Sequence, residues 1–227
     1  MNMKYPGAVL FDMDGVIFDS EPIHERIFIE YAAELGFVCP PEEYRHLIGT
    51  SSVTQWRLMK EKHHLPDAPQ ALSDEKMAHY KTFLAASSGL RPISGIPTLL
   101  NDLTMHDIPF ALASSNTTDV IEATLKAIGL HTVITTIVGG NDVPQAKPAP
   151  DIFLLAAKKL KVPPKDCLVI EDSTNGILAA RRAGMRSLGF NNPNSPGQQL
   201  HTADFECSSL EGLTVNELCH IFTHPPK

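Results

Sequence analysis

The stretch AVLFDMDGVIFDSEP, residues 8–22, places two closely spaced carboxylates directly behind a short apolar run. The run 8–11 is too short for a helix and has no polar alternation, which is typical of a strand buried on both faces of a parallel sheet. Asp12 and Asp14 stand two positions apart, so their negative charges repel each other. Two carboxylates behind a buried strand therefore need a positive charge nearby to compensate for their repulsion.

Comparable apolar runs recur along the chain, at residues 110–114, 133–138, 167–170 and 187–190. Helical patterns separate most of these runs. One helical pattern has apolar residues at helical spacing, namely Ile96, Leu99, Leu100 and Leu103. A later helical pattern ends at Gly129. Alternating strands and helices form right-handed βαβ units. The sequence therefore predicts an α/β fold with a doubly wound, Rossmann-like parallel sheet.

The segment between Pro22 and about residue 88 departs from this alternation, because it has helical patterns and no convincing strand. Pro22 suits a first helical position, and Gly36 suits the end of the same helix. Further helices are expected near residues 41–48, 52–63 and 74–86. We therefore predict two domains, an α/β core formed by residues 1–17 and 90–227 and an inserted helical domain formed by residues 18–89.

The composition limits the partners of the protein. The formal net charge of −7 argues against a nucleic-acid surface or an anionic membrane as a partner. The longest apolar stretch is far shorter than the ~20 residues of a membrane span, and we read no signal peptide. The four cysteines show neither a CxxC pair nor metal-ligand spacing, so we expect free thiols in a cytoplasmic protein. The oligomeric state stays open, and a monomer is plausible.

Chemically informative residues follow the predicted strands, at the carboxyl ends where ligands bind in open α/β sheets. They are Asp12, Asp14, Ser114, Ser115, Asn116, Lys147, Glu171 and Asp172. Carboxylates gathered at one place would repel each other unless a cation lies among them. Hard carboxylate oxygens without a nearby His or Cys favour Mg²⁺. The sequence therefore predicts a magnesium site at this edge of the sheet.

Four short motifs at these positions resemble a known family. DMDG at 12–15, ASSN at 113–116, KPAPD at 147–151 and EDSTNG at 171–176 are similar, in order and separation, to the four motifs of the haloacid dehalogenase-like hydrolase superfamily. The resemblance covers essentially the whole chain. A helical cap inserted after the first motif marks the branch that includes β-phosphoglucomutase and many small sugar-phosphate phosphatases.

The resemblance implies an aspartyl-phosphate mechanism. Asp12 would attack phosphorus as the nucleophile, and Asp14 would protonate the leaving alkoxide and then activate water. Mg²⁺ would be held by Asp12, Asp172 and the backbone carbonyl of Asp14, and Glu171 is a further candidate ligand. The substrate would be a small phosphorylated metabolite.

The same resemblance implies a phosphate-binding set. Lys147 would place a positive charge at the transferring phosphoryl group, and the Ser114 hydroxyl would bind its oxygens together with backbone N–H groups at a helix start. Ser115 and Asn116 are candidates for the same set, although both would also suit helix capping.

Plainer alternatives exist for the acidic residues. Asp12 and Asp14 with Gly15 would also suit a simple turn or a calcium loop. Glu171 and Asp172 would also suit the first turn of a helix, where acidic side chains complement the helix dipole. A non-catalytic binding protein with this fold is accordingly a further alternative to an enzyme.

Within the family, Asp14 disfavours haloacid dehalogenases and phosphonatases, which lack the second aspartate. The remaining choice is between a phosphatase and a phosphomutase. His24 and Lys76 stand where the β-phosphoglucomutases carry a histidine and a cap lysine. Ser52 stands where those mutases carry an arginine for a second phosphate, and serine lacks its charged bidentate grip. We therefore expect hydrolysis of a phosphate monoester, with a β-phosphoglucomutase-type mutase as the alternative.

Overall fold

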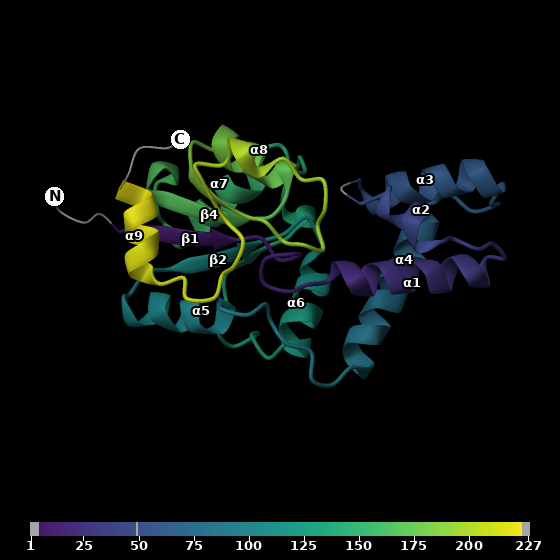
Figure 1. Ribbon diagram of the computed structural model, residues 1–227, viewed down its shortest axis with the longest axis horizontal. Coiled ribbons are helices and arrows are strands. Elements are labelled where there is room, and N and C mark those ends of the chain that lie inside the picture. Colours follow the sequence, from purple (N-terminus) through teal and green to yellow (C-terminus); the bar gives the residue numbers. More distant parts are fainter. Residues whose placement is uncertain (1–4, 49, 224–227) are drawn as a thin grey trace. The chain divides into compact units, whose positions relative to one another are not determined.

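A computed structural model describes residues 5–48 and 50–223. The chain divides into two compact units, one formed by Met1–Asp19 and Gly89–Lys227 and the other by Ser20–Ser88. We call them the α/β unit and the helical unit (Figure 1). These limits differ by one or two residues from the boundaries expected from the sequence, which lie after residues 17 and 89.

The α/β unit is built on a six-stranded sheet in which neighbouring strands run parallel, in the order β3-β2-β1-β4-β5-β6. The strands are β1 (Ala8–Phe11), β2 (Phe110–Ala113), β3 (Ile137–Val138), β4 (Cys167–Glu171), β5 (Arg186–Phe190) and β6 (Phe205–Cys207). All four residues of β1 are buried, as expected for an apolar run without alternation. The predicted α/β fold with a parallel sheet is therefore confirmed.

Two details of the sheet differ from the sequence prediction. The run 133–138 forms a strand only at Ile137–Val138, because the amides of Val133 and Ile134 donate to the carbonyl of Leu130 in a turn. Strand β6 was not predicted, since it has three residues and lies at an edge of the sheet, where none of its side chains is buried.

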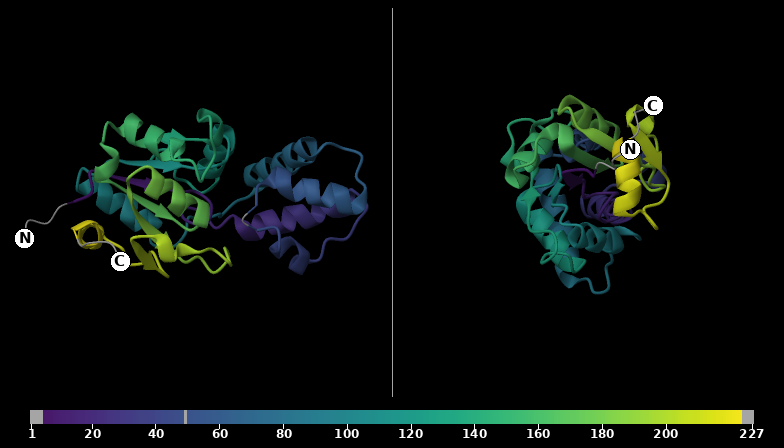
Figure 2. Two further views of the ribbon diagram at one scale, coloured as in Figure 1. Left: turned by 90° about the horizontal axis from the view of Figure 1, so that it is seen from above. Right: turned by 90° about the vertical axis from the view of Figure 1, so that its left-hand side faces the viewer.

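Helices cover both faces of the sheet (Figure 1, Figure 2). On one face α7 (Asp151–Leu160) and α8 (Thr174–Arg182) pack in a single apolar cluster with alternate residues of the inner strands. On the other face lie α5 (Ile96–Met105) and α6 (Thr118–Ala127), with α9 (Val215–Thr223) beside α5. Short 3₁₀ turns occur at Gly140–Asp142, Pro164–Asp166 and Leu200–Thr202.

The helical unit contains α1 (Glu21–Glu34), α2 (Pro41–Arg45), α3 (Ser52–His63) and α4 (Pro69–Ala86). Its core is aromatic, with the rings of Phe28 and Trp56 stacked at 4.4 Å and Tyr31 edge-on to Trp56 at 5.1 Å. Helix α4 begins at Pro69 rather than near residue 74, because proline is accommodated in the first turn of a helix, where its missing N–H costs no hydrogen bond.

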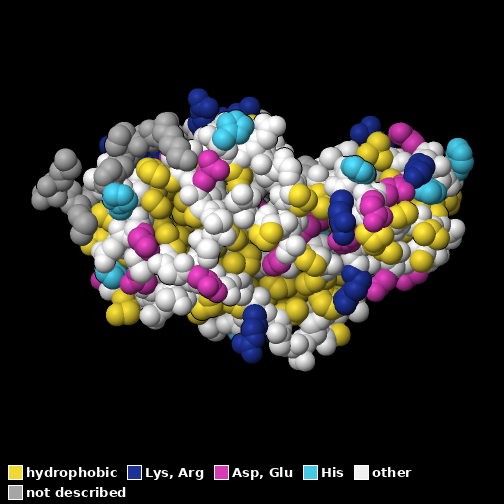
Figure 3. All heavy atoms as spheres, in the orientation of Figure 1, with side chains coloured by type: hydrophobic (Ala, Val, Ile, Leu, Met, Phe, Trp, Pro, Cys, Tyr) yellow, Lys and Arg dark blue, Asp and Glu magenta, His cyan; other side chains and the backbone are white. Residues whose placement is uncertain are grey.

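The surface of the helical unit mixes charges of both signs on the face drawn in Figure 3, where Lys, Arg, Asp and Glu side chains are interspersed. Within residues 5–48 and 50–223, no helix combines the length and the apolar character that a membrane crossing would require. The four cysteines are free thiols, and Cys39, Cys167 and Cys219 are buried.

Candidate active site

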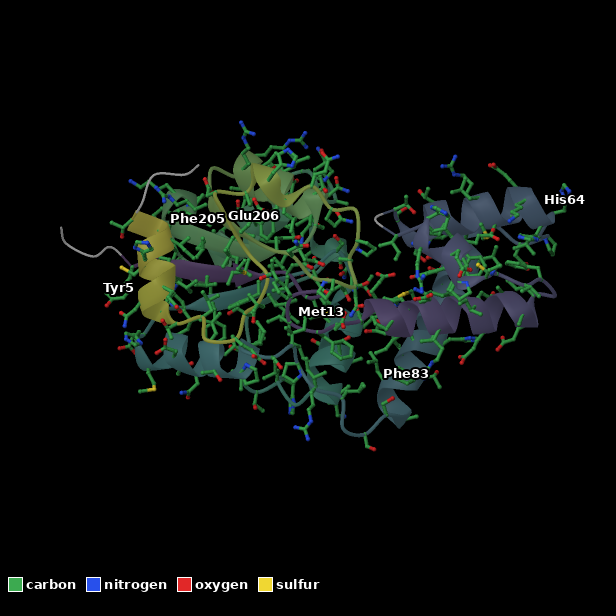
Figure 4. The ribbon with its side chains drawn as sticks, in the orientation of Figure 1. Tyr5, Met13, His64, Phe83, Phe205 and Glu206 are labelled. Carbon is green, nitrogen blue, oxygen red and sulfur yellow. The ribbon has the colours of Figure 1, made fainter. Side chains whose placement is uncertain are left out.

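The chain turns sharply after β1, and this turn sets the position of the first two acidic residues. The amide of Asp12 still donates to the carbonyl of Ile170 on β4, at 3.0 Å. The carbonyl of Met13 then accepts from the amides of residues 16–18, and the amide of Gly15 donates to the carbonyl of Phe18 at 2.8 Å. Figure 4 labels Met13 in this turn. The backbone hydrogen bonds hold the DMDG segment as a closed turn at the carboxyl end of β1.

Three carboxylates meet at the carboxyl ends of β1 and β4, which are neighbours in the sheet. Asp12, Glu171 and Asp172 each offer an oxygen that lies within 4.8 Å of the other two. All three residues are buried, with exposed fractions of 7%, 1% and 5%. The structure therefore brings together acidic residues that lie about 160 positions apart in the sequence.

Lys147 is the positive charge at this cluster. Its ammonium donates to Asp12 Oδ1 at 2.5 Å, to Glu171 Oε1 at 2.8 Å and to the carbonyl of Ala113 at 3.1 Å. It also lies 4.9 Å from the centre of the Phe153 ring. Burial alone would lower the pKa of Lys147, but Asp12 and Glu171 outweigh it and raise that pKa, so the ammonium stays charged.

One lysine does not neutralise three buried carboxylates. Burial raises the pKa of Asp12 to about 7, with Glu171 and Asp14 adding to the rise and Lys147 opposing it. Burial, followed by the charges of Glu171 and Asp12, likewise raises the pKa of Asp172 well above its ordinary value. The cluster thus gathers more carboxylates than one lysine can neutralise, and burial disfavours their ionised forms.

The chemistry of this cluster fits a divalent cation. Its three converging donors are carboxylate oxygens, and the group found among the described residues contains no His or Cys. Oxygen ligands of this kind suit Mg²⁺, Ca²⁺ or Mn²⁺. A bound dication would also supply the positive charge that the buried carboxylates lack.

Two glycines make room for the carboxylates. A Cβ at Gly15, whose φ is +78°, would lie 2.0 Å from Asp172 Oδ2, and a Cβ at Gly176 would lie 1.7 Å from Glu171 Oε1. Both carboxylates therefore rest against bare backbone. Sequence reasoning did not assign Gly176 a role; the available signal was a glycine in the first turn of a helix, where it has a cost in stability.

The structure joins Asp14 to Asn116. The Asn116 side-chain amide donates to Asp14 Oδ2 at 2.6 Å, while its backbone N–H donates to Ser114 Oγ at 3.1 Å. Ser114 is buried directly after β2, and Ser115 is exposed. The carboxylate of Asp14 lies outside the three-carboxylate group. Asn116 thus contacts the second aspartate through its side chain, which the sequence did not predict.

Within the helical unit, two of the three candidate residues meet. His24 Nδ1 lies 2.9 Å from the ammonium of Lys76, and the His24 ring lies 4.2 Å from the ring of Tyr80. Burial, followed by the Lys76 charge, lowers the pKa of His24, so the imidazole is neutral and can accept from Lys76. Ser52 makes a different contact, accepting a hydrogen bond from Ser73 Oγ at 2.8 Å.

Sequence reasoning missed a polar turn that follows β5. Ser195 Oγ donates to Asp172 Oδ2 at 2.6 Å, and the buried amide of Asn192 donates to the carbonyl of Gly15 at 2.9 Å. The only sequence signal was an asparagine-rich segment at another strand end, which is equally typical of an ordinary loop.

Comparisons with known proteins agree with this arrangement. Residues 9–190 match the family model described as haloacid dehalogenase-like hydrolase. The bifunctional riboflavin kinase/FMN phosphatase of Arabidopsis thaliana is 32% identical to this chain, and the match covers 94% of this chain. The same match covers only 56% of that relative's length. The fructose-1-phosphate phosphatase YqaB of Escherichia coli is 32% identical, covering 82% of the chain and 96% of the relative.

Among solved structures, a β-phosphoglucomutase from Clostridium difficile superimposes with a TM-score of 0.79 at 26% identity, covering 95% of this chain and 96% of the other. The matched family model takes in the ends of β1, β2 and β4 and the Lys147 segment, where the buried acidic cluster lies. The chain belongs to the haloacid dehalogenase-like hydrolase family.

Proposed function

We propose that the protein is a Mg²⁺-dependent phosphatase that hydrolyses a small phosphorylated metabolite through an aspartyl-phosphate on Asp12. Its family and its phosphatase-named relatives make it a phosphoric monoester hydrolase. The observation that carries the finer proposal is the Lys147 ammonium, fixed 2.5 Å from Asp12 Oδ1 inside a buried acidic cluster. A carboxylate that must attack a phosphate dianion needs this kind of local positive charge.

In the proposed first step, an Asp12 oxygen attacks phosphorus, a P–O bond forms, and the bond to the substrate's alkoxide oxygen breaks. Lys147 holds Asp12 in place and stabilises charge on the phosphoryl oxygens. In this proposal Ser114 Oγ and the amides at the start of α6 would bind those oxygens as well. Ser115 belongs to the same proposed set.

Asp14 is proposed to act as the general acid and then as the general base. It donates a proton to the leaving alkoxide and then takes one from the water that hydrolyses the aspartyl-phosphate. The 2.6 Å hydrogen bond from Asn116 fixes the orientation of the Asp14 carboxyl group. We therefore assign Asn116 to the acid–base group as well as to the candidate phosphate-binding residues.

Asp12, Asp172 and the backbone carbonyl of Asp14 would hold the Mg²⁺, which would screen the repulsion between the phosphate and the carboxylates. Glu171 offers a further oxygen to this site. It already accepts from Lys147 and, at 2.6 Å through Oε2, from the amide of Ser173. We propose that the main role of Glu171 is to fix the position of the Lys147 ammonium through this hydrogen bond.

Substrate choice is proposed to rest with the helical unit as a cap domain, through His24, Lys76 and Ser52. The 2.9 Å contact between half-buried His24 and buried Lys76 supports a defined arrangement of this pair. The phosphate ester of a sugar or a similar small alcohol fits the name of the Escherichia coli relative. The cytoplasm is the expected location, in keeping with four unpaired thiols.

A mutase is the second candidate, because a β-phosphoglucomutase structure matches the chain over almost its whole length. Ser52, which is hydrogen-bonded to Ser73, favours hydrolysis instead. Neither hydroxyl provides the positive charge that would bind a second phosphate.

The test is a phosphate-release screen over a panel of phosphorylated metabolites, with and without Mg²⁺, run beside Asp12→Asn. We expect metal-dependent release by the wild type and none by the variant. Incubation with β-glucose 1-phosphate and a trace of the 1,6-bisphosphate addresses the alternative. Isomerisation without phosphate release would favour the mutase, and full activity of Asp12→Asn would refute the role of Asp12.

A further inference from the structure

The turn that follows β5, residues 191–196, is held in a fixed conformation by its own hydrogen bonds. The amide of Asn191 donates to the carbonyl of Cys207 on β6 at 2.8 Å. Asn192 Oδ1 accepts from the amide of Asn194 at 2.8 Å, and the carbonyl of Asn192 accepts from the amide of Ser195 at 3.1 Å. Prolines on both sides of the Asn194-Ser195 pair restrict the backbone further.

This 191–196 turn is also attached to the segment that follows β1. The side-chain amide of Asn192, which is only 4% exposed, donates to the carbonyl of Gly15 at 2.9 Å. Asn194 Nδ2 donates to Asp19 Oδ2 at 2.6 Å. Two side chains of one turn therefore bind the loop that carries Asp14. These two hydrogen bonds fix the position of the 191–196 turn relative to the acidic cluster.

From this position Ser195 reaches a carboxylate of the cluster. Its hydroxyl donates to Asp172 Oδ2 at 2.6 Å. The same oxygen lies against the backbone of Gly15, where a Cβ would approach Oδ2 to 2.0 Å but Oδ1 only to 3.2 Å. Among the described residues, no protein donor contacts Asp172 Oδ1. The hydroxyl and the glycine together fix one oxygen of Asp172 and leave the other one available.

We propose that Ser195 is a positioning residue that orients the Asp172 carboxylate for the divalent cation. This inference rests on the metal site of the proposed function. A carboxylate held by one hydrogen bond keeps a single rotamer, so less conformational entropy is lost when it binds a metal ion. Partners of this kind typically contribute about 10–100-fold to metal affinity.

The test measures metal binding in the absence of substrate. Mn²⁺, which prefers the same oxygen ligands as Mg²⁺, is titrated into the metal-free protein, and free Mn²⁺ is counted by electron paramagnetic resonance. We expect Ser195→Ala to weaken Mn²⁺ binding by about 10-fold or more. Ser195→Thr, which retains the hydroxyl, should bind close to the wild-type value. Ser208→Ala, which removes an exposed hydroxyl elsewhere in the same unit, should bind as the wild type does.

Melting curves in a chelator verify that each variant is folded. The near-isosteric Ser195→Cys variant, whose thiol is a weak donor, repeats the measurement should the alanine variant prove unstable. Wild-type affinity in both Ser195→Ala and Ser195→Cys would overturn the role of Ser195 and leave the proposed phosphatase intact. Equal weakening in Ser195→Ala and Ser195→Thr would overturn it too, because the hydroxyl would then be irrelevant. Failure of the wild type to bind Mn²⁺ would instead remove the metal site on which both proposals rest.

Discussion

Replacing Gly176 by alanine should destabilise the protein, although the same change ordinarily stabilises a helix. Gly176 lies in the first turn of α8, and glycine costs at most about 1 kcal/mol relative to alanine on helix propensity alone, the value for a helix interior. In this structure the new Cβ would lie 1.7 Å from Glu171 Oε1, and Cβ atoms essentially never approach another atom closer than 3.0 Å. The carboxylate would therefore have to retreat by more than 1 Å.

That retreat would break two short hydrogen bonds of Glu171, one from Lys147 at 2.8 Å and one from the Ser173 amide at 2.6 Å. Hydrogen bonds to a charged group contribute about 1.5–3 kcal/mol each, so their loss outweighs the helix term and leaves a net cost of about 2–5 kcal/mol. Lys147 would also lose one of its two anionic partners, so phosphatase activity should fall with the stability.

The assay is urea unfolding of the metal-free protein, with phosphate release measured in parallel. Asn175→Ala is the matched control, because it changes an exposed neighbour in the same helical turn and should alter the free energy of unfolding by less than about 0.5 kcal/mol. In a Glu171→Asp background, whose shorter side chain leaves room for a methyl group, Gly176→Ala should cost much less. A Gly176→Ala protein as stable and as active as the wild type would refute the reasoning.

Further predictions concern the charged groups. The raised pKa of Asp12, about 7 in the folded protein against an ordinary value of 3.8, means that the folded state binds a proton more tightly than the unfolded state. The free energy of unfolding of the metal-free protein, measured by urea titration, should therefore fall as the pH rises from about 4 through about 7. Asp12→Asn should make this pH dependence weaker. A free energy of unfolding that rises over the same pH range would contradict the electrostatic account. Asp14→Asn should slow the release of the leaving group in the first step by about 10²–10⁴-fold for alkyl phosphates but less for p-nitrophenyl phosphate, since that leaving group needs no proton; equal losses for both substrates in single-turnover release of the leaving group would argue against an acid role. Lys147→Ala should reduce kcat by about 10²-fold or more, as removal of an oxyanion donor does, and also raise KM; a variant with wild-type kinetics would exclude Lys147 from the reaction.

The sequence was sufficient to predict that the acidic residues after β1 and β4 would come together with Lys147 at the carboxyl ends of the strands. Parallel strands bury apolar runs on both faces, so AVLF and its counterparts were recognisable, and the polar residue after each run was thereby located. The predicted topology alone was enough to place Asp12, Lys147 and Asp172 together at the carboxyl ends of the strands, before any side-chain contact was known.

Other features could not be predicted, because they depend on contacts between distant segments. The clash that makes Gly176 necessary involves a carboxylate five positions earlier, whose rotamer is set by Lys147. The hydrogen bond from Ser195 to Asp172 depends on how a turn folds after β5. Strand β6 pairs with β5 along its whole length, and its own three residues are too few for a strand to be recognised from the sequence.

The central claim, that Asp12 accepts the phosphoryl group, is tested most directly by locating that group in the protein. Asp14→Asn would be treated with p-nitrophenyl phosphate and Mg²⁺, quenched in acid, and analysed by intact mass and peptide mapping. The account predicts a gain of about 80 Da on the peptide that contains Asp12, since the intermediate forms but cannot be hydrolysed efficiently. Phosphate release without any such adduct, or an adduct that maps to another residue, would contradict it.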